Sequence, residues 1–480
     1  MDRVLRLLGM RYATAALMLV AVAALYGAAT FSRPGEASER GRETPVTHAV
    51  MVCPGHEGGR LAVQSLTRKG SGGRVDMAPT KGGSPLGSMT APGQGWGEDT
   101  ESGDDSYTLR ATGPIAGGLA AEQTLDEDGG DDRGLAGTRC AVPGTDLWFT
   151  GPGPVAADEL DLYLTNVDAQ PASVDLTALS GEGPLDTTEG RGTPVAPYTT
   201  RVVRIGRSPE GLGDIVGTAA DLALRVRTTS GRVAASLRVR TGEKKGVEWV
   251  PQSPAPAPSA LVPGVPGGSG ARRLLVAVPG ETDARIRVQV ITADGAFAPQ
   301  GQDVLDAPAR TVTAVPLDGA LSGRAAAVRL TADRPVLAGF TAARGADVAY
   351  GSATPPLSAS APGVVADNRF DSTLSLTAPS GAASVQVTTM NAQGAGTPRQ
   401  IDIPAGRTVE TKLAAPGAGA DAPFGLVITP RRGSAPVHAS RTLATGKGDD
   451  YLFTVLPVVP APTTLRLPDV ADSQTALIPD

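Results

Sequence analysis

Residues 286–290 read Ile-Arg-Val-Gln-Val, with apolar and polar side chains in strict alternation. A period of two is typical of an antiparallel strand that is buried on one face only. The same pattern returns in Val-Asp-Leu at 174–176 and in Val-Gln-Val at 385–387. Short runs of this kind, separated by Gly and Pro turns, follow one another beyond residue 31, and no stretch there shows a sustained helical period. The pattern predicts an all-β protein.

An aromatic residue recurs at a constant spacing of 101 residues, at Trp148, Trp249, Tyr350 and Tyr451. A carboxylate lies shortly before each of them, at Asp146, Glu248, Asp347 and Asp450. A fixed period of this kind indicates a repeat architecture. Each repeat holds about six strands in about 100 residues, which predicts repeated antiparallel β-sandwich-like units. A propeller-like ring of four units is the alternative.

The predicted domain organisation follows from these patterns and from changes in composition. Pro and Gly crowd residues 251–270, which favours a semi-stiff polyproline connector there. We predict a signal peptide or signal anchor at 1–31, a polar spacer at 32–45, β units at 46–148, 149–250, 273–350 and 372–456, linkers at 251–272 and 351–371, and a C-terminal tail with a closing strand at 457–480.

The N-terminal segment has the composition of an export signal. Arg3, Arg6 and Arg11 precede an apolar run at residues 12–31. The run is long enough to span a bilayer as a hydrophobic helix, whereas Gly27-Ala28-Ala29 offers the small residues of a cleavage site. In either case we expect an extracytoplasmic protein, anchored in the membrane by this helix or secreted.

Cysteine usage agrees with that location. The chain has two cysteines, Cys53 and Cys140, and both follow the apolar run. Exported proteins meet an oxidising environment, so a single disulfide is favoured over two free buried thiols.

The charge and the motifs argue against several functions. The net charge is −6, and the arginines alternate along strands instead of forming a basic patch, so no nucleic-acid partner is expected. The sequence has no Gly-x-Ser-x-Gly elbow and no His-Glu-x-x-His zinc helix, and its three histidines, His48, His56 and His438, could meet only through folding of the chain. We therefore expect no enzyme activity, no cofactor and no metal site.

Two sets of residues leave alternatives open. The acidic stretch 126–132 resembles a calcium loop, but residue 137 is Gly where a ligating Glu would stand, which favours a solvated loop. The four repeated aromatics are either core anchors, the favoured interpretation, or platforms for the sugar rings of a wall polymer. A glycan-active enzyme, using two carboxylates such as Asp126 and Asp146, is a less favoured possibility.

The sequence also resembles a known family in several places. They are Cys53-Pro54, Leu-Tyr-Leu-Thr-Asn at 162–166, Trp249-Val250-Pro251, Val-Pro-Gly-Val-Pro at 262–266, and the block Cys-Ala-Val-Pro-Gly-Thr-Asp-Leu-Trp-Phe-Thr-Gly at 140–151. From about residue 46 to 468 the chain thereby resembles actinobacterial secreted or signal-anchored proteins of unknown function. The resemblance implies a gene near glycosyltransferases, and it supplies no activity.

These observations together give a functional expectation. We expect a non-enzymatic extracytoplasmic β-repeat protein that binds or organises cell-envelope components. Its partners would be cell-wall glycan or envelope proteins, with membrane contact through the N-terminal segment. An accessory protein for envelope polysaccharide synthesis or export is the alternative.

Overall fold

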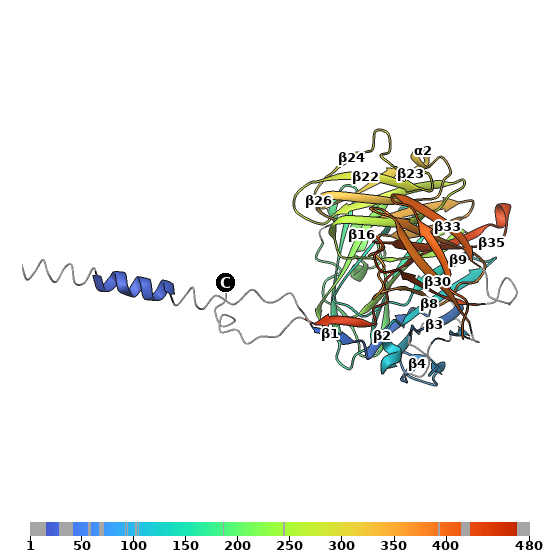
Figure 1. Ribbon diagram of the computed structural model, residues 1–480, viewed down its shortest axis with the longest axis horizontal. Coiled ribbons are helices and arrows are strands. Elements are labelled where there is room, and N and C mark those ends of the chain that lie inside the picture. Colours follow the sequence, from blue (N-terminus) through green and yellow to red (C-terminus); the bar gives the residue numbers. More distant parts are fainter. Residues whose placement is uncertain are drawn as a thin grey trace, which may run out of the picture. The chain divides into compact units, whose positions relative to one another are not determined.

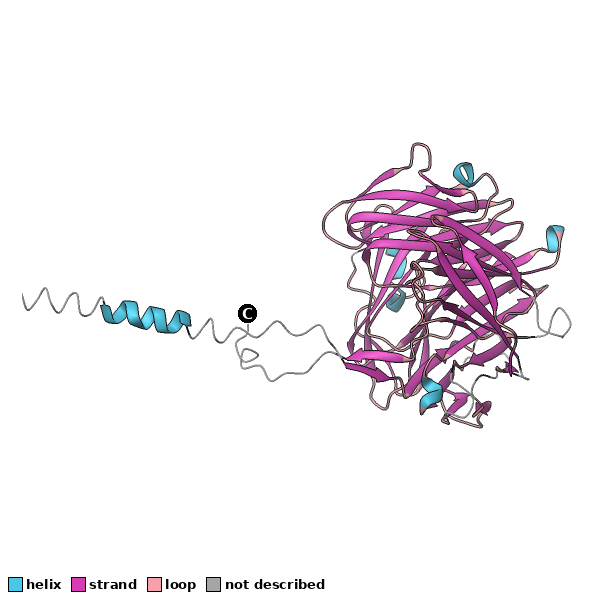
Figure 2. Ribbon diagram, viewed as in Figure 1, coloured by secondary structure: helices cyan, strands magenta, loops and turns pink. Residues whose placement is uncertain are grey.

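Antiparallel sheets make up most of the protein (Figure 2). The structure is a computed structural model. It describes residues 16–27, 42–55, 59–66, 72–91, 93, 95–100, 103, 105–185, 187–242, 245–391, 394–413 and 423–467. Among the described residues seven sheets, one of which has eight strands and is divided into the two sheets of sandwich 3, form four successive sandwiches, which we number 1 to 4 and which cover residues 48–139, 146–253, 257–352 and 363–458. The predicted all-β class with repeated sandwich-like units is confirmed.

Sandwich 1 consists of two four-stranded sheets, with the strand orders β2-β7-β4-β5 and β6-β3-β8-β9. Its elements are β2 (His48–Cys53), β3 (Gly59–Gln64), β4 (Arg74–Pro79), β5 (Gly87–Met89), β6 (Trp96–Thr100), β7 (Tyr107–Thr112), η1 (Pro114–Ala116), β8 (Ala120–Glu127) and β9 (Gly134–Arg139).

Sandwich 2 repeats this plan, with the orders β13-β12-β16-β10-β19 and β15-β11-β17-β18, and with β14 also paired to β12. Its elements are β10 (Asp146–Pro152), β11 (Glu159–Asn166), β12 (Ala172–Ser180), β13 (Gly183–Leu185), β14 (Thr193–Val195), β15 (Thr199–Arg204), η2 (Pro209–Gly211), η3 (Gly213–Val216), β16 (Asp221–Ser230), β17 (Ala234–Gly242), β18 (Lys245–Val250) and β19 (Gln252–Ser253).

In sandwich 3 one long strand, β26, belongs to both sheets. Its first half pairs with β20 and β22, and its second half pairs with β21 and β27. The elements are β20 (Ala257–Val265), β21 (Ala271–Val278), β22 (Ala284–Thr292), β23 (Gly295–Phe297), β24 (Val304–Ala307), β25 (Thr311–Pro316), α2 (Asp318–Leu321), β26 (Ala326–Arg344) and β27 (Asp347–Ser352).

Sandwich 4 has the orders β28-β34-β30-β31, with β32 also on β30, and β33-β29-β35-β36. Its elements are β28 (Gly363–Val365), β29 (Asp371–Ala378), β30 (Ala383–Asn391), β31 (Gly394–Ala395), β32 (Arg399–Ile403), β33 (Arg407–Leu413), β34 (Gly425–Pro430), β35 (His438–Thr445), η4 (Gly448–Asp450) and β36 (Leu452–Val458).

The alternating pattern places one face of each strand in a core. In β22, Ile286, Val288 and Val290 are buried, while Arg287 is exposed. Each sandwich has its own large apolar cluster between its two sheets. Burying one aliphatic side chain of this size contributes about 1.5–3 kcal/mol, so the period of two accounts for the stability of each sandwich.

One edge strand of each sandwich joins it to its neighbours. β9 contacts β18, β18 contacts β27, β27 contacts β36, and β36 returns to β9. Sandwich 4 therefore packs on sandwich 1, and the four sandwiches form a closed cycle of contacts. Figure 1 shows the consequence: β35, late in the chain, lies near β9. Each unit is a sandwich, as expected, but the units pack against one another instead of being held apart by linkers.

Glycines allow the strands of this cycle to approach closely. A Cβ atom added at Gly134 of β9 would lie 2.8 Å from the carbonyl oxygen of Val247 in β18. One added at Gly246 of β18 would lie 3.0 Å from the backbone nitrogen of Val348 in β27. The first distance is shorter than real Cβ atoms essentially ever show and the second is tighter than nine in ten real contacts, so a larger residue at either position would require the neighbouring strand to shift.

Two segments that were expected to be linkers contain strands instead. Residues 251–272 hold β19 and β20, and residues 351–371 hold β28. Pro258 and Pro263 of β20 fall at irregularities in its pairing with β26, between Ala257 and Ser259 and between Val262 and Val265. A strand tolerates proline at such positions because the missing N–H is not needed for the ladder. The Pro-rich composition therefore concealed the first strand of sandwich 3.

The terminal parts of the chain form a separate unit, residues 1–44 with 465–480. A helix covers residues 16–27, and β37 (Thr464–Leu467) pairs with β1 (Arg42–Pro45) in a two-stranded sheet. The strand expected in the tail exists, but it completes no further sandwich. Within the described residues no helix is long and apolar enough to cross a membrane. The basic flank, the Gly27-Ala28-Ala29 step beyond Gly27, and most of the 32–45 spacer lie outside the described residues.

A disulfide joins Cys53 and Cys140, as the sequence predicted. Cys53 ends β2 in one sheet of sandwich 1, and Cys140 follows β9 in the other, so the bond ties the two sheets together. Both residues are buried.

Replacing both cysteines by serine should destabilise sandwich 1 by about 2–4 kcal/mol, because the unfolded chain regains the freedom of an 87-residue loop. The measurement is hydrogen exchange in β2 and β9, with β29 of sandwich 4 as an internal reference. Unchanged protection of β2 and β9 would contradict a structural role for the bond.

Candidate functional site

Three of the four repeated aromatics are core residues. Trp148 and Trp249 are each 6% exposed, and Tyr350 is 3% exposed, whereas Tyr451 is half-buried. Trp249 packs against the ring of Tyr163 at a centroid distance of 5.4 Å. Arg344 covers the ring of Tyr451 at 3.9 Å. Burial of the first three rings leaves no open face for a sugar, which favours the interpretation as anchors.

The aromatics do not occupy one equivalent position. Trp249 lies on β18 and Tyr350 on β27, the strands that join neighbouring sandwiches, and Tyr451 comes just before β36. Trp148 lies instead on β10, the first strand of sandwich 2. The repeats differ in loop length, so equal spacing in sequence does not place these residues in the same strand.

Trp148 belongs to a small cluster at the boundary between sandwiches 2 and 3. Its ring packs with Leu275, Ala277, Val312 and Leu337 of sandwich 3. Arg225 lies over the ring at 5.0 Å and forms two hydrogen bonds to the Asp146 carboxylate, at 2.8 and 2.7 Å. These hydrogen bonds hold the pKa of Asp146 below its usual value. Asp146 is therefore an ion-pair partner here.

Two buried carboxylates lie where the strands of the cycle meet. Glu248 of β18 is 1% exposed and accepts a hydrogen bond from the backbone N–H of Gly137 in β9, at 2.9 Å. Asp347 of β27 is fully buried and accepts one from the N–H of Phe453, at 2.6 Å. Burial raises the pKa of Asp347 to about 7 and that of Glu248 well above its usual value. Both carboxylates bridge neighbouring sandwiches.

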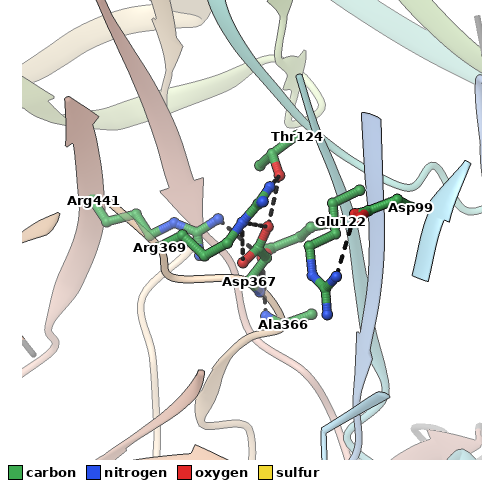
Figure 3. A network of polar contacts seen from close by, with 8 residues as sticks. Asp99, Glu122, Thr124, Ala366, Asp367, Arg369 and Arg441 are labelled. Carbon is green, nitrogen blue, oxygen red and sulfur yellow. Dashed lines mark hydrogen bonds and ion pairs between the residues drawn. The ribbon is translucent and has the colours of Figure 1, made fainter. Parts of the chain in front are cut away.

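A network of polar contacts closes the cycle between sandwiches 1 and 4 (Figure 3). Glu122 of β8 pairs with the fully buried Arg441 of β35 at 3.0 Å. The same carboxylate accepts the backbone N–H groups of Ala366 and Asp367 at 2.9 and 3.0 Å. Arg369 donates to Asp367 at 3.0 Å, and the Thr124 hydroxyl donates to Asp367 at 2.6 Å. Side chains from both ends of the repeat region therefore share one buried network.

The candidate ligand site is a cavity of about 440 Å³ where sandwich 3 meets sandwich 4. This volume lies within the range of about 300–1,000 Å³ that small-molecule sites usually have. Sandwich 3 contributes β20 and β26 to the walls, and sandwich 4 contributes the turn at Pro379 and the start of β35. Five prolines line it: Pro254, Pro355, Pro356, Pro379 and Pro436. The walls are therefore stiff and mostly apolar.

Arg329 and His438 are the two ionisable side chains in the lining of the cavity. Arg329 of β26 is half-buried, and no residue in the part of the chain that the structure describes forms an ion pair with it. His438 lies 2.8 Å from the carbonyl oxygen of Thr354 through Nδ1, which requires the proton on Nδ1 and leaves Nε2 as an acceptor. Burial, together with the charge of Arg329, lowers the pKa of His438 to about 4. At neutral pH Arg329 is the charged group of the site.

The other residues considered from the sequence do not meet at a site. His48 is exposed, His438 lines the cavity, and His56 lies outside the described residues. Among the described residues no group of His, Cys, Asp and Glu has the arrangement of a metal site. Asp132 of the acidic stretch pairs with Arg238 at 2.7 Å.

Sequence patterns did not reveal Arg329 or the Glu122–Arg441 pair. Arg329 sits in an ordinary alternating strand, Ala-Val-Arg-Leu at 327–330. Glu122 and Arg441 are 319 residues apart, and neither lies in a motif. The first strands of the four sandwiches hold a signal in the sequence. Where one of these strands lacks a residue that another has, an unfilled space between sandwiches is expected.

Comparisons with known proteins give a family but no activity. A model described as "Family of unknown function (DUF5719)" matches residues 97–414. No curated protein matches the chain. Among solved structures, the chain is similar to a "tetra-tandem repeat in extending region of large adhesion protein", at 16% identity over 86% of this chain and 100% of that one, with a TM-score of 0.08. So low a TM-score gives this likeness no weight for fold or function.

Proposed function

Since the chain belongs to the family of unknown function DUF5719, whose description assigns no activity, we propose a function from its own geometry: it is a non-enzymatic extracytoplasmic protein that binds or organises cell-envelope components. The observation that carries the proposal is the closed cycle of four sandwiches. Every sandwich is held by two neighbours, so the loops and the cavity between sandwiches 3 and 4 sit on a stiff frame. Binding residues are commonly displayed in this way by a rigid scaffold.

Two features support the proposed location. The Cys53–Cys140 disulfide is typical of a protein that folds in an oxidising compartment. The helix at 16–27 exposes apolar side chains such as Leu17 and Leu25, and it follows a basic segment in the sequence. The resemblance to actinobacterial secreted or signal-anchored proteins points the same way. In this proposal the N-terminal segment directs export and then anchors the protein or is removed.

The proposed function predicts that the full chain captures envelope material. Intact producing cells carrying a tagged full chain would be treated with external protease and, separately, cross-linked before purification on the tag. We expect digestion by the external protease and co-purification of cell-wall glycan or of a small set of envelope proteins. Excess untagged full chain added before cross-linking is the control, and it should compete for specific partners.

Three other results would count against this proposal. Protection from external protease, with recovery in the cytosol, would refute the proposed location. Turnover of a labelled wall polymer by the purified protein would refute a purely binding role. Capture of glycosyltransferases in place of glycan would favour the second candidate, an accessory protein for envelope polysaccharide synthesis or export.

A further inference from the structure

The cavity lies at the boundary between sandwiches 3 and 4, and the boundary between sandwiches 2 and 3 is its counterpart one repeat earlier. At each boundary, the first strand of one sandwich pairs with a long neighbouring strand: β10 with β16 in sandwich 2, and β20 with β26 in sandwich 3. Trp148 lies opposite Arg225 in the first pair, and Leu261 lies opposite Arg329 in the second. Arg225 and Arg329 therefore occupy equivalent positions in the two repeats.

The boundary between sandwiches 2 and 3 is filled by the protein itself. The Trp148 ring packs against sandwich 3, and Asp146, two residues earlier on the same face of β10, binds Arg225 through two hydrogen bonds. A ring and a carboxylate thus complete this boundary. Side chains alternate between the two faces of a strand, so residues two apart share one face and both groups reach the same arginine.

The boundary between sandwiches 3 and 4 lacks both groups. Leu261 replaces the tryptophan, and Ser259, opposite Thr331, stands at the position of Asp146, opposite Arg227. Leucine fills less space than an indole ring, and serine brings no negative charge. Leu261, Ser259 and Arg329 all line the 440 Å³ cavity. The cavity is therefore the space that a ring and a carboxylate occupy one repeat earlier.

The opposite wall of the cavity, which sandwich 4 contributes, is also more polar than its counterpart in sandwich 3. In sandwich 3, Ala277 pairs with Leu337, and this wall meets Trp148. In sandwich 4 the equivalent pair is Thr377 with His438, and His438 lines the cavity. The wall that is apolar in sandwich 3 therefore carries, in sandwich 4, a neutral imidazole that can accept a hydrogen bond. This change suits a ligand that has a polar N–H or O–H group on its ring.

We propose that the cavity binds a carboxylate that carries a six-membered or fused ring, with the carboxylate paired to Arg329, the ring between the proline walls beside Leu261, and a ring N–H or O–H donated to His438. The inference rests on the proposed function in one respect, that the natural ligand is an envelope component. An aromatic acid and an acidic sugar of a glycan share this chemistry. The chemistry itself is testable on the purified protein.

The test measures binding of defined probes to the full chain by saturation-transfer NMR. Indole-3-acetate combines the ring of Trp148 with the carboxylate of Asp146, and indole-3-acetamide is its neutral counterpart. Glucuronate and glucose form the corresponding sugar pair. We expect at least one carboxylate to bind about tenfold or more tightly than its neutral partner, since a hydrogen-bonded charge pair is lost in the neutral probe. The stronger pair identifies the source of the ligand.

Variants separate the cavity from other surfaces. Arg329→Ala should weaken carboxylate binding about tenfold or more, whereas Arg225→Ala, the same change one repeat earlier, should leave it unchanged. Ser259→Asp should also abolish binding, because it supplies Arg329 with the carboxylate that Arg225 receives from Asp146. Leu261→Trp should do so by filling the ring site. Ser259→Asn adds similar bulk without charge and should cost less than Ser259→Asp.

The proposal and the proposed function fail in different ways. Equal binding of carboxylates and neutral probes, unchanged binding by Arg329→Ala, or no transfer to either carboxylate at about 10 mM would overturn the ligand chemistry. If the full chain captures envelope material and Ser259→Asp captures it equally, the cavity is not the site, but the proposed function survives. If the probes bind as expected and nothing is captured from envelopes, the ligand chemistry of the cavity survives and the proposed function fails.

Discussion

Replacing Glu122 by alanine is expected to open the contact between sandwiches 1 and 4. Arg441 is fully buried, and Glu122 is the carboxylate that pairs with it. Removing one partner of a buried ion pair costs about 3–5 kcal/mol, because the other charge is left unpaired away from water. The amides of Ala366 and Asp367 lose their acceptor in the same change. Hydrogen exchange at these two amides should rise sharply, ahead of exchange within sandwich 2.

A double variant and a surface pair are the controls for this prediction. Glu122→Gln combined with Arg441→Met removes both charges and keeps an acceptor for the two amides, so it should recover most of the lost stability, since replacing both partners of a buried pair is often close to neutral. Lys412→Ala breaks the exposed pair with Asp371 and should leave stability unchanged within about 1 kcal/mol. If Glu122→Ala were as stable as the Lys412→Ala protein, the network would not be what closes the cycle.

The second large effect is a dependence of stability on pH that originates at Asp347. Burial raises the pKa of this carboxyl from 3.8 to about 7 in the folded protein. Between these two pH values the folded protein holds a proton that the unfolded chain releases, so the free energy of unfolding falls as pH rises. The slope is about 1.4 kcal/mol per pH unit at most, and the total loss is about 4 kcal/mol by pH 7.

Asp347→Asn should remove this loss. Asparagine keeps an oxygen to accept the N–H of Phe453 and has nothing to ionise. We expect the variant to match the natural protein near pH 4 and to exceed its stability by about 4 kcal/mol at pH 7 and above. Urea unfolding at several pH values measures this difference. Glu248→Gln should act in the same direction, because burial also raises the pKa of Glu248.

The difference in free energy of unfolding between the variant and the natural protein isolates the effect of Asp347. Other groups, whose contribution to stability changes with pH in the opposite direction, cancel in this difference. Burial lowers the pKa of His438 to about 4, so its contribution to stability is complete above about pH 6.5 and is lost as pH falls toward 4. His438 is present in both proteins, and its contribution cancels in the difference. Asp450→Asn, which removes a carboxylate that is 93% exposed, is the matched control for the loss of one carboxylate. A difference that does not change with pH for Asp347→Asn would refute the prediction.

The sequence revealed what depends on local pattern. The alternation at 286–290 identified β22 and its buried face, because burial of alternate side chains leaves a period of two in any half-buried strand. The number of cysteines and their position after an export segment predicted the disulfide. β20 was missed because its prolines resemble a linker, and only the strand that it pairs with shows that the irregularities absorb them.

What the sequence could not reveal depends on partners far along the chain. Glu122 and Arg441 are ordinary charged residues until the cycle brings them together. Arg329 looks like the other alternating arginines, and among the described residues no carboxylate pairs with it as Asp146 pairs with Arg225. Equal spacing placed Trp148 with Trp249, although one begins a sandwich and the other ends it. Such differences are properties of pairing, which a single stretch of sequence does not contain.

The closing contact also sets an order of events during synthesis. The chain emerges from its N-terminus, so sandwich 1 is complete long before Arg441, 319 residues after Glu122, becomes available. During that interval the face of sandwich 1 around Glu122 is open, while sandwiches 2 and 3 fold beside it. Contacts this distant form late and slowly. At high concentration, sandwich 4 of one chain can reach sandwich 1 of another first, so exchanged oligomers are the expected product of crowded refolding.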